Sequence, residues 1–255
     1  MAPPFSHQVK FDRACHHLDA LERAERGEEP QAYVLADEPD PDGPGRVGRV
    51  KKMNFAYFGC LIGDCVHNLR SSLDHLALEL AVANVNPLPA GYEEDSGFPI
   101  FWKQAMISSE EEKRIGSIHP VAKTIIKDLQ PHVRGQDYVL DPLWKLHELD
   151  RIDKHRSLHL TEFRAMKVGL SGTNFEVEGL QMVGKGDEVQ SGAVVAAYQA
   201  TPVDPNSEMN VNLRLEGQVA FQKVPPFPGQ LVVPILQDIR NYVQDHVFFP
   251  LTPYL

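Results

Sequence analysis

The fold is decided by one stretch of sequence, Gly63-Asp64-Cys65-Val66-His67-Asn68-Leu69-Arg70-Ser71-Ser72-Leu73-Asp74-His75, which lies in the middle of the longest helical pattern in the chain. Apolar residues recur every three or four positions from Phe58 to Leu80, and this period predicts one apolar stripe along a helix. Asn54 is a suitable N-cap for that helix, which ends near Asn84. Polar groups on its other side are costly to bury unless they are paired, so the helix holds a polar network or a site.

A helix and a hairpin are predicted before this central helix. Residues 8–26 place apolar side chains at helical spacing, and Gly27 is a plausible stop. Residues 31–36 and 46–53 are typical of two strands, and the loop between them is rich in proline, glycine and aspartate. The two strands therefore form a β-hairpin near the start of a helical region.

Three shorter helices and one buried segment are predicted after the central helix. Phe98-Pro99-Ile100-Phe101 has the composition of a buried segment. Residues 108–109 are serines followed by glutamates, a capping-box pattern that starts a short acidic helix. Residues 120–129 form another short helix. Asp141-Pro142 starts a third, which ends near His155-Arg156, because aspartate caps a helix and proline fits its first turn.

The C-terminal part of the chain has strand patterns and then a helix. Four segments rich in alternating or β-branched residues predict an antiparallel β-meander, namely residues 158–170, 174–183, 188–200 and 209–221. A last helix is expected from Leu231 to Val247. The fold class is therefore α+β: a helical bundle with an N-terminal β-hairpin insertion and a C-terminal antiparallel β-meander plus a final helix.

We expect one elaborated domain over residues 1–255, since a chain of 255 residues can bury a good core. Residues 1–157 would form mainly the helical bundle, with the hairpin at 31–53. Residues 158–255 would form the antiparallel sheet and the C-terminal helix.

Composition predicts a cytoplasmic protein. The hydrophobic content of 42% and the charged content of 24% are ordinary for a soluble globular protein. No apolar run approaches the roughly 20 residues that span a bilayer, and residues 1–7 lack a signal-peptide pattern, so no membrane partner is expected. Three cysteines are too few for a disulfide framework. The net charge of -10 opposes non-specific attraction to nucleic acid, although it leaves room for a local basic groove.

The polar side of the central helix is unusual because it has no lysine or glutamate between Asp64 and His75. A solvated helix face normally carries those residues, so we expect an interface or a cleft here. In the alternative interpretation, the polar groups form a structural network, with Asp74 pairing with Arg70 one turn back. The polar side comprises two adjacent stripes, Asp64, Asn68, Ser71 and His75, and beside them His67, Arg70 and Asp74.

Arg70 and His75 are separated by four residues, and this segment resembles the signature of the HEPN superfamily. These are helical bundles that include many dimeric, metal-independent ribonucleases. Ser71 is a partial match, since asparagine, histidine or aspartate is commoner after the arginine. Arg114 and His119 have the same spacing. Arg70 and His75 are the preferred candidates because they lie on a long amphipathic helix. The resemblance implies an RNA substrate, no cofactor or metal, and a homodimer whose two copies of Arg70 and His75 share a cleft.

The chemistry that the resemblance implies is reasonable for these side chains. Cleavage of RNA by its own 2′-hydroxyl needs a group that moves protons, and His75 suits the role of general acid and base. It also needs a cation for the developing phosphate charge, which Arg70 supplies with a forked guanidinium. Binding residues are expected on the same face and at the end of the later helix: His67, Asn68, Asp74, Lys154 and His155. For Lys154 and His155 the alternative is a favourable interaction with the helix dipole.

The chain is also similar to an uncharacterised bacterial protein family. The similarity rests on three segments: His67-Asn68-Leu69-Arg70-Ser71-Ser72-Leu73-Asp74-His75-Leu76, Phe98-Pro99-Ile100, and the run from Leu146 to Arg156. It spans most of the chain and implies no particular activity.

Two further interpretations remain open. In the first, the protein is a non-catalytic interaction or ligand-binding protein whose polar network is structural. In the second, it is a metal-dependent hydrolase, since Asp64 with His67 and His147 with Asp150 have the i, i+3 spacing of ligands in helical bundles. The chain has no zinc-type Cys/His spacing. It also lacks dinucleotide-binding, P-loop and serine-hydrolase motifs.

Overall fold

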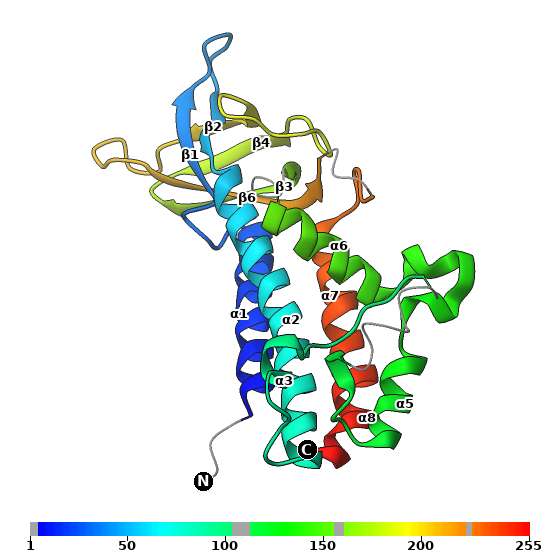
Figure 1. Ribbon diagram of the computed structural model, residues 1–255. Coiled ribbons are helices and arrows are strands. Elements are labelled where there is room, and N and C mark those ends of the chain that lie inside the picture. Colours follow the sequence, from blue (N-terminus) through cyan, green and yellow to red (C-terminus); the bar gives the residue numbers. More distant parts are fainter. Residues whose placement is uncertain (1–4, 104–112, 156–160, 223–225) are drawn as a thin grey trace. The chain divides into compact units, whose positions relative to one another are not determined.

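The computed structural model describes residues 5–103, 113–155, 161–222 and 226–255 (Figure 1). About 48% of the chain is helix and 24% is strand, and the predicted α+β class is confirmed. The chain forms two compact units, each assembled from separate parts of the sequence. The helical unit comprises Met1–Leu18, Ile62–Ser157 and Pro234–Leu255, and the sheet unit comprises Asp19–Leu61 and Leu158–Val233.

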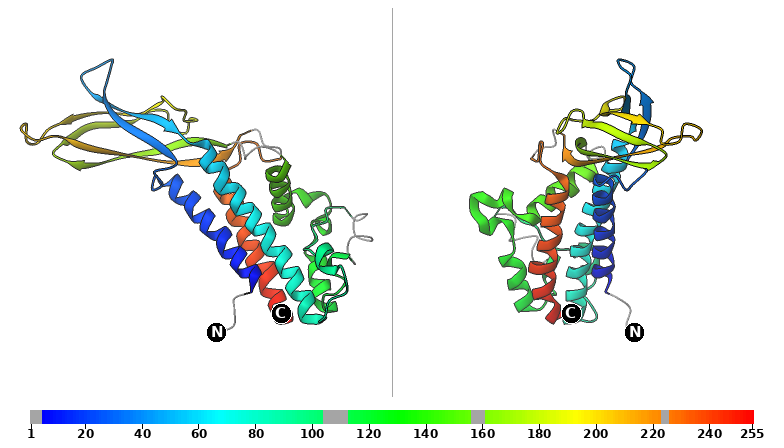
Figure 2. Two further views of the ribbon diagram at one scale, coloured as in Figure 1. Left: turned by 60° about the vertical axis from the view of Figure 1, so that its left-hand side comes forward. Right: turned by 180° about the vertical axis from the view of Figure 1, so that it is seen from behind.

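The long helices begin and end close to the predicted positions, and three of them pack lengthwise against one another. Figures 1 and 2 show α1 (Ser6–Glu25), α2 (Phe55–Asn84) and α7 (Val232–Tyr242) side by side. The last helix continues beyond the predicted end at Val247, as a π-helical segment and then short helical turns to Tyr254. The shorter elements are α3 (Tyr92–Asp95), α5 (Pro120–Asp128), η2 (Pro131–Leu140), α6 (Pro142–His155), η3 (Val243–Phe248), α8 (Phe249–Leu251) and η4 (Thr252–Tyr254).

Local signals in the sequence account for these helices. The predicted apolar stripe of α2 is fully buried, including Leu69, Leu73 and Leu76. Asp141 caps α6 as predicted, because its Oδ1 accepts a hydrogen bond of 2.8 Å from the Leu143 N–H. The acidic helix predicted at residues 108–109 lies outside the described residues. Among the residues that are described, no helix is long and apolar enough to cross a membrane.

Every strand in the described part of the chain belongs to the sheet unit, and the pairing of these strands differs from the predicted meander. The strands are β1 (Tyr33–Pro39), β2 (Arg46–Met53), β3 (Thr161–Thr173), β4 (Glu176–Met182), β5 (Val194–Thr201) and β6 (Asn210–Phe221). One sheet has the order β1-β2-β5-β4 and the other pairs β3 with β6. All four strand pairs are antiparallel, as predicted, but a meander would place β3 beside β4 and β5 beside β6. The predicted meander is therefore wrong in its strand order.

Close packing between the sheets explains this order. Gly48 of β2 is closely packed, since a Cβ atom there would lie 3.1 Å from Leu213 of β6 and 3.2 Å from Ala196 of β5. Val168, Ala196 and Tyr198 form the centre of the core between the two sheets. The hairpin of β1 and β2 thus belongs with the C-terminal strands, because β2 pairs with β5. The expected single domain over residues 1–255 stays a prediction.

Candidate functional site

Arg70 lies at the centre of a closed hydrogen-bond network in the helical unit. Its Nη2 donates to Asp74 Oδ1 at 2.8 Å and to the carbonyl oxygen of Phe98 at 2.7 Å. The backbone N–H of Phe98 donates in turn to Asp74 Oδ1 at 3.0 Å. Because Arg70 and Asp74 are four residues apart on α2, their side chains meet on one face, and the predicted pairing between them is confirmed. The network fastens the buried segment that begins at Phe98 to the central helix.

Close packing at Gly97 supports the same network. A Cβ atom at Gly97 would lie 3.1 Å from Asp74 Oδ1 and 3.7 Å from Arg114 Nη1, so a side chain at this position would crowd Asp74. The next residues are buried as predicted, with Phe98 inaccessible and Phe101 5% exposed. The Arg70 side chain is only 12% exposed.

His147 of α6 is affected by the charge of Arg70, and the sequence did not predict this interaction. Burial lowers the pKa of His147, and the positive charge of Arg70 lowers it further, so the imidazole is neutral near pH 7. Its ring lies 5.0 Å from that of Trp102, between ring centroids. Two buried atoms in this part of the helical unit, Arg70 Nη1 and Asp150 Oδ1, have no hydrogen-bond partner within the described part of the chain.

Residues from three distant parts of the chain lie around Arg70. Arg70 and Asp74 lie on α2, Phe98 follows α3, and His147, on which the charge of Arg70 acts, lies on α6. The convergence was not visible in the sequence, because nothing in the spacing states which helices are neighbours. We call Arg70, Asp74, Phe98 and His147 the Arg70 cluster.

His75 belongs to a separate cluster around the first turn of α1. His75 Nδ1 lies 2.8 Å from Ser6 Oγ, which also donates to Glu79 Oε1 at 2.5 Å. Glu79 Oε1 accepts a bond of 2.6 Å from the Ser6 backbone N–H, and Glu79 also forms an ion pair with His7. Burial alone would raise the pKa of Glu79, but hydrogen bonds from Ser6 and His7 hold it below its ordinary value. A glutamate of α2 therefore caps α1, and we call these residues the Glu79 cluster.

Arg70 and His75 are thus engaged by different parts of the helical unit. Five residues apart on a helix, they point about 140° away from each other. Arg70 bonds to the segment at Phe98, whereas His75 bonds to Ser6 of α1. The structure does not bring the two side chains of one chain together.

The other predicted binding residues are placed individually. His67 is exposed, with Nε2 at 3.4 Å from Ser71 Oγ. Asn68 donates to the backbone oxygen of Asp64 at 2.7 Å, one turn back. Lys154 is 51% exposed and pairs with Asp150 at 2.8 Å. His155 is the last residue of α6, and its side chain lies outside the described residues.

The two predicted metal-ligand pairs, Asp64 with His67 and His147 with Asp150, do not form a joint metal site. Asp64 Oδ2 lies 3.9 Å from His17 Nδ1 of α1, and Asp150 is held by Lys154. No group of three or more histidine, cysteine, aspartate or glutamate side chains suited to a metal ion occurs in the part of the chain that the structure describes.

Comparison with family models, with curated proteins and with solved structures gave no match for this chain.

Proposed function

We propose that the protein is a non-catalytic interaction protein in which the polar side of α2 is a structural network. The observation that carries the proposal is the engagement of Arg70: its Nη2 makes both of its hydrogen bonds inside the chain, to Asp74 and to Phe98. Buried cations are paired whether or not they do chemistry, and here the pairing fastens one segment to another.

Three further features support an interaction role. Arg70 is largely buried, which limits its access to a phosphate. His75 is used in the Glu79 cluster, at the start of a helix. The net charge of -10 disfavours general affinity for nucleic acid.

Stability measurements test this proposal. Arg70→Ala should lower the free energy of unfolding by about 1–3 kcal/mol, because it leaves two partly buried acceptors, the Asp74 carboxylate and the Phe98 carbonyl, without this donor. The control is Lys167→Ala, which removes a cation that is 69% exposed and pairs with a partly exposed carboxylate, Glu216, and it should cost at most about 1 kcal/mol. Wild-type protein should leave mixed RNA intact in EDTA. RNA cleavage that Arg70→Ala abolishes without loss of stability would contradict the proposal.

A second candidate function, a metal-independent ribonuclease of HEPN type acting as a homodimer, is favoured by one specific observation. Arg70 Nη1 has no partner among the described residues, and the charge of this guanidinium acts on His147, whose pKa is lowered by burial and by that charge. Phosphodiester cleavage needs such a donor for the developing charge and a neutral base. A second copy would have to supply His75, or His147 would take its place.

Single-residue variants separate these possibilities. Mixed RNA is incubated in EDTA with wild type, His75→Ala and His147→Ala, and the mass of each protein in solution is measured by light scattering. Loss of cleavage in His75→Ala with a dimeric mass supports the shared cleft, and loss in His147→Ala supports a site within one chain. Intact RNA with wild type rules out this function for those substrates.

A further inference from the structure

The seam between α1 and α2 has a register that two polar contacts fix. Near the start of α1, Ser6 Oγ lies 2.8 Å from His75 Nδ1, and farther along this helix His17 Nδ1 lies 3.9 Å from Asp64 Oδ2. The two contacts are the same number of residues apart on each helix, and they follow one another in opposite directions along the chain. The two helices are therefore antiparallel over this length, as Figure 2 shows.

The helical period extends this register to the residues between the two contacts. Residues four, seven and eleven positions apart share one face of a helix, which gives one stripe on each helix. The stripe on α1 is Ser6, Lys10, Arg13 and His17, and the stripe on α2 is Asp64, Asn68, Ser71 and His75. The register places Lys10 opposite Ser71 and Arg13 opposite Asn68. Two cations in the middle of the seam therefore face neutral side chains.

The position of Arg13 on the seam has independent support. Burial lowers the pKa of His17, the charge of Asp64 opposes this effect, and the charge of Arg13 adds to it. The Arg13 guanidinium thus lies close enough to the seam to act on His17. Arg13 is exposed and Lys10 is partly exposed, so a ligand in solution can reach both side chains.

The side chains of Lys10 and Arg13 form no ion pair or hydrogen bond with any residue in the described ranges. Carboxylates occur near the two ends of the seam. Glu79 accepts a hydrogen bond of 2.5 Å from Ser6 Oγ, and Asp64 faces a histidine. Neither carboxylate pairs with the two cations, so the positive charge in the middle of the seam is not neutralised by an ion pair within the described part of the chain.

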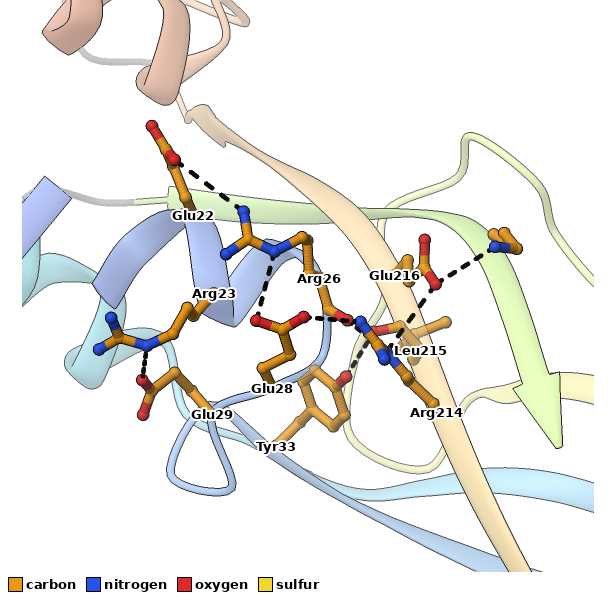
Figure 3. Close-up of polar contacts among 10 residues, drawn as sticks. Glu22, Arg23, Arg26, Glu28, Glu29, Tyr33, Arg214, Leu215 and Glu216 are labelled. Atoms are coloured by element: carbon orange, nitrogen blue, oxygen red, sulfur yellow. Dashed lines mark hydrogen bonds and ion pairs between the residues drawn. The ribbon is translucent and has the colours of Figure 1, made fainter. Parts of the chain in front are cut away.

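The arginines at the other end of α1 are paired instead (Figure 3). Arg23 Nε donates to Glu29 at 2.7 Å, and Arg26 lies 3.3 Å from Glu28 and 3.9 Å from Glu22. The chain has 35 aspartates and glutamates against 25 lysines and arginines, so carboxylates are in excess. Two neighbouring cations without a carboxylate are therefore a local exception, and an external anion would complete their pairing.

Neutral donors beside the two cations complete a set that suits an anion. Ser71 Oγ lies 3.4 Å from His67 Nε2, which is long for a hydrogen bond, so the hydroxyl can turn toward a ligand. Asn68 Nδ2 donates to the backbone oxygen of Asp64 at 2.7 Å, and its second proton remains for another acceptor. The middle of the seam thus offers an ammonium, a guanidinium, a hydroxyl and an amide proton to one acceptor group.

We propose that the middle of the α1–α2 seam binds a phosphate group, held by Arg13, Lys10 and Ser71. A guanidinium forks onto two phosphate oxygens, an ammonium acts as a point charge, and a hydroxyl donates to a further oxygen. A carboxylate has only two oxygens and would match fewer of these donors. The inference goes beyond the proposed interaction function and uses no residue of the Arg70 cluster.

An NMR titration of the full chain with sodium phosphate at pH 7 tests the proposal, and sodium chloride at equal ionic strength is the control. Phosphate should shift the Arg13 Nε–H and Ser71 amide signals and should saturate at millimolar concentration, whereas chloride should not. N-acetyl-phosphoserine amide is titrated in parallel. Tighter binding of this probe would identify a phosphorylated side chain as the source of the phosphate group, and tighter binding of inorganic phosphate would identify the free ion. Equal shifts with chloride, or no saturation with either phosphate probe, would overturn the proposal.

Single-residue variants locate the site. Arg13→Gln and Lys10→Gln should each weaken phosphate binding by about tenfold or more, because each removes a charge-assisted donor. The matched control is Arg26→Gln, which removes an arginine that is 49% exposed and already paired, and it should leave phosphate binding unchanged. Equal weakening in all three variants would show a response to overall charge alone and would also overturn the proposal. Phosphate binding is measured without RNA, so its failure is distinct from a failure of the proposed function.

Discussion

Glu25 Oε1 accepts a hydrogen bond of 2.7 Å from the backbone N–H of Val219, so the last residue of α1 covers part of the β6 edge. Burial raises the pKa of Glu25 to about 7, although the bond from Val219 lowers it. The folded state therefore favours the protonated carboxyl. Its stabilising contribution is complete below the ordinary pKa near 4.5 and is lost as the pH rises through about 7.

Glu25→Gln should remove this pH dependence, because the amide keeps an acceptor for Val219 and cannot ionise. At pH 5 the variant and wild type should have similar free energies of unfolding in urea, and at pH 8 the variant should be more stable. Glu178→Gln, at an exposed position on β4, is the control and should change neither value. A variant that is equally or less stable at pH 8 would contradict the raised pKa.

Glu79→Gln should loosen the first turn of α1. The hydrogen bonds from Ser6 and His7 hold the pKa of Glu79 low, so its contribution is present above pH 4.5 and is lost as the pH falls through the lowered value. Loss of a cap typically costs about 0.5–2 kcal/mol. Hydrogen exchange at residues 9–12, measured at pH 7, should become faster in the variant. The exposed Glu94→Gln of α3 is the matched control, and equal exchange in both variants would refute the capping role.

Tyr33→Phe should destabilise the sheet unit. It removes the donor to the buried carbonyl of Leu215 and leaves an acceptor unsatisfied, at a cost of about 1–3 kcal/mol. Tyr57→Phe is the comparison, because the Tyr57 hydroxyl bonds to Glu29 at 3.3 Å in a partly exposed position. In urea titrations followed by circular dichroism, Tyr33→Phe should unfold at a clearly lower urea midpoint than Tyr57→Phe. Equal midpoints would show that the hydrogen bond of Tyr33 to Leu215 contributes little.

Local patterns were enough to predict the long helices and the strands, but not the short helical segments Tyr92–Asp95 and Pro131–Leu140. The period of α2 and the cap at Asp141 are encoded within a few residues of sequence, and both are found in the structure. Strand order depends on which distant edges meet. The contact of Gly48 with Leu213 joins residues far apart in the chain, and no local pattern distinguishes it from the contacts of a meander.

The candidate site was predictable to the same extent. The Arg70–Asp74 pair follows from helical spacing and is present. The approach of His147 to Arg70 depends on how α6 packs against α2, and the capping of α1 by Glu79 depends on how α1 packs there. Spacing along one helix could therefore single out Arg70 and His75 as candidate site residues. It could not predict that Arg70 bonds to the segment at Phe98 whereas His75 bonds to Ser6.

Gly217→Ala should be among the most destabilising small substitutions in this chain. A Cβ atom at Gly217 of β6 would lie 2.4 Å from the Phe163 ring and 2.5 Å from the Arg164 backbone oxygen, and neither can yield cheaply in a packed sheet. Overpacking of this kind typically costs about 1–3 kcal/mol, and backbone contact adds to it. Gly169→Ala, in the paired strand β3, meets nothing within 4 Å and should be neutral or slightly stabilising. Thermal unfolding of the two variants should therefore move in different directions, and equal midpoints would show that β3 and β6 do not pack as closely as Gly217 requires.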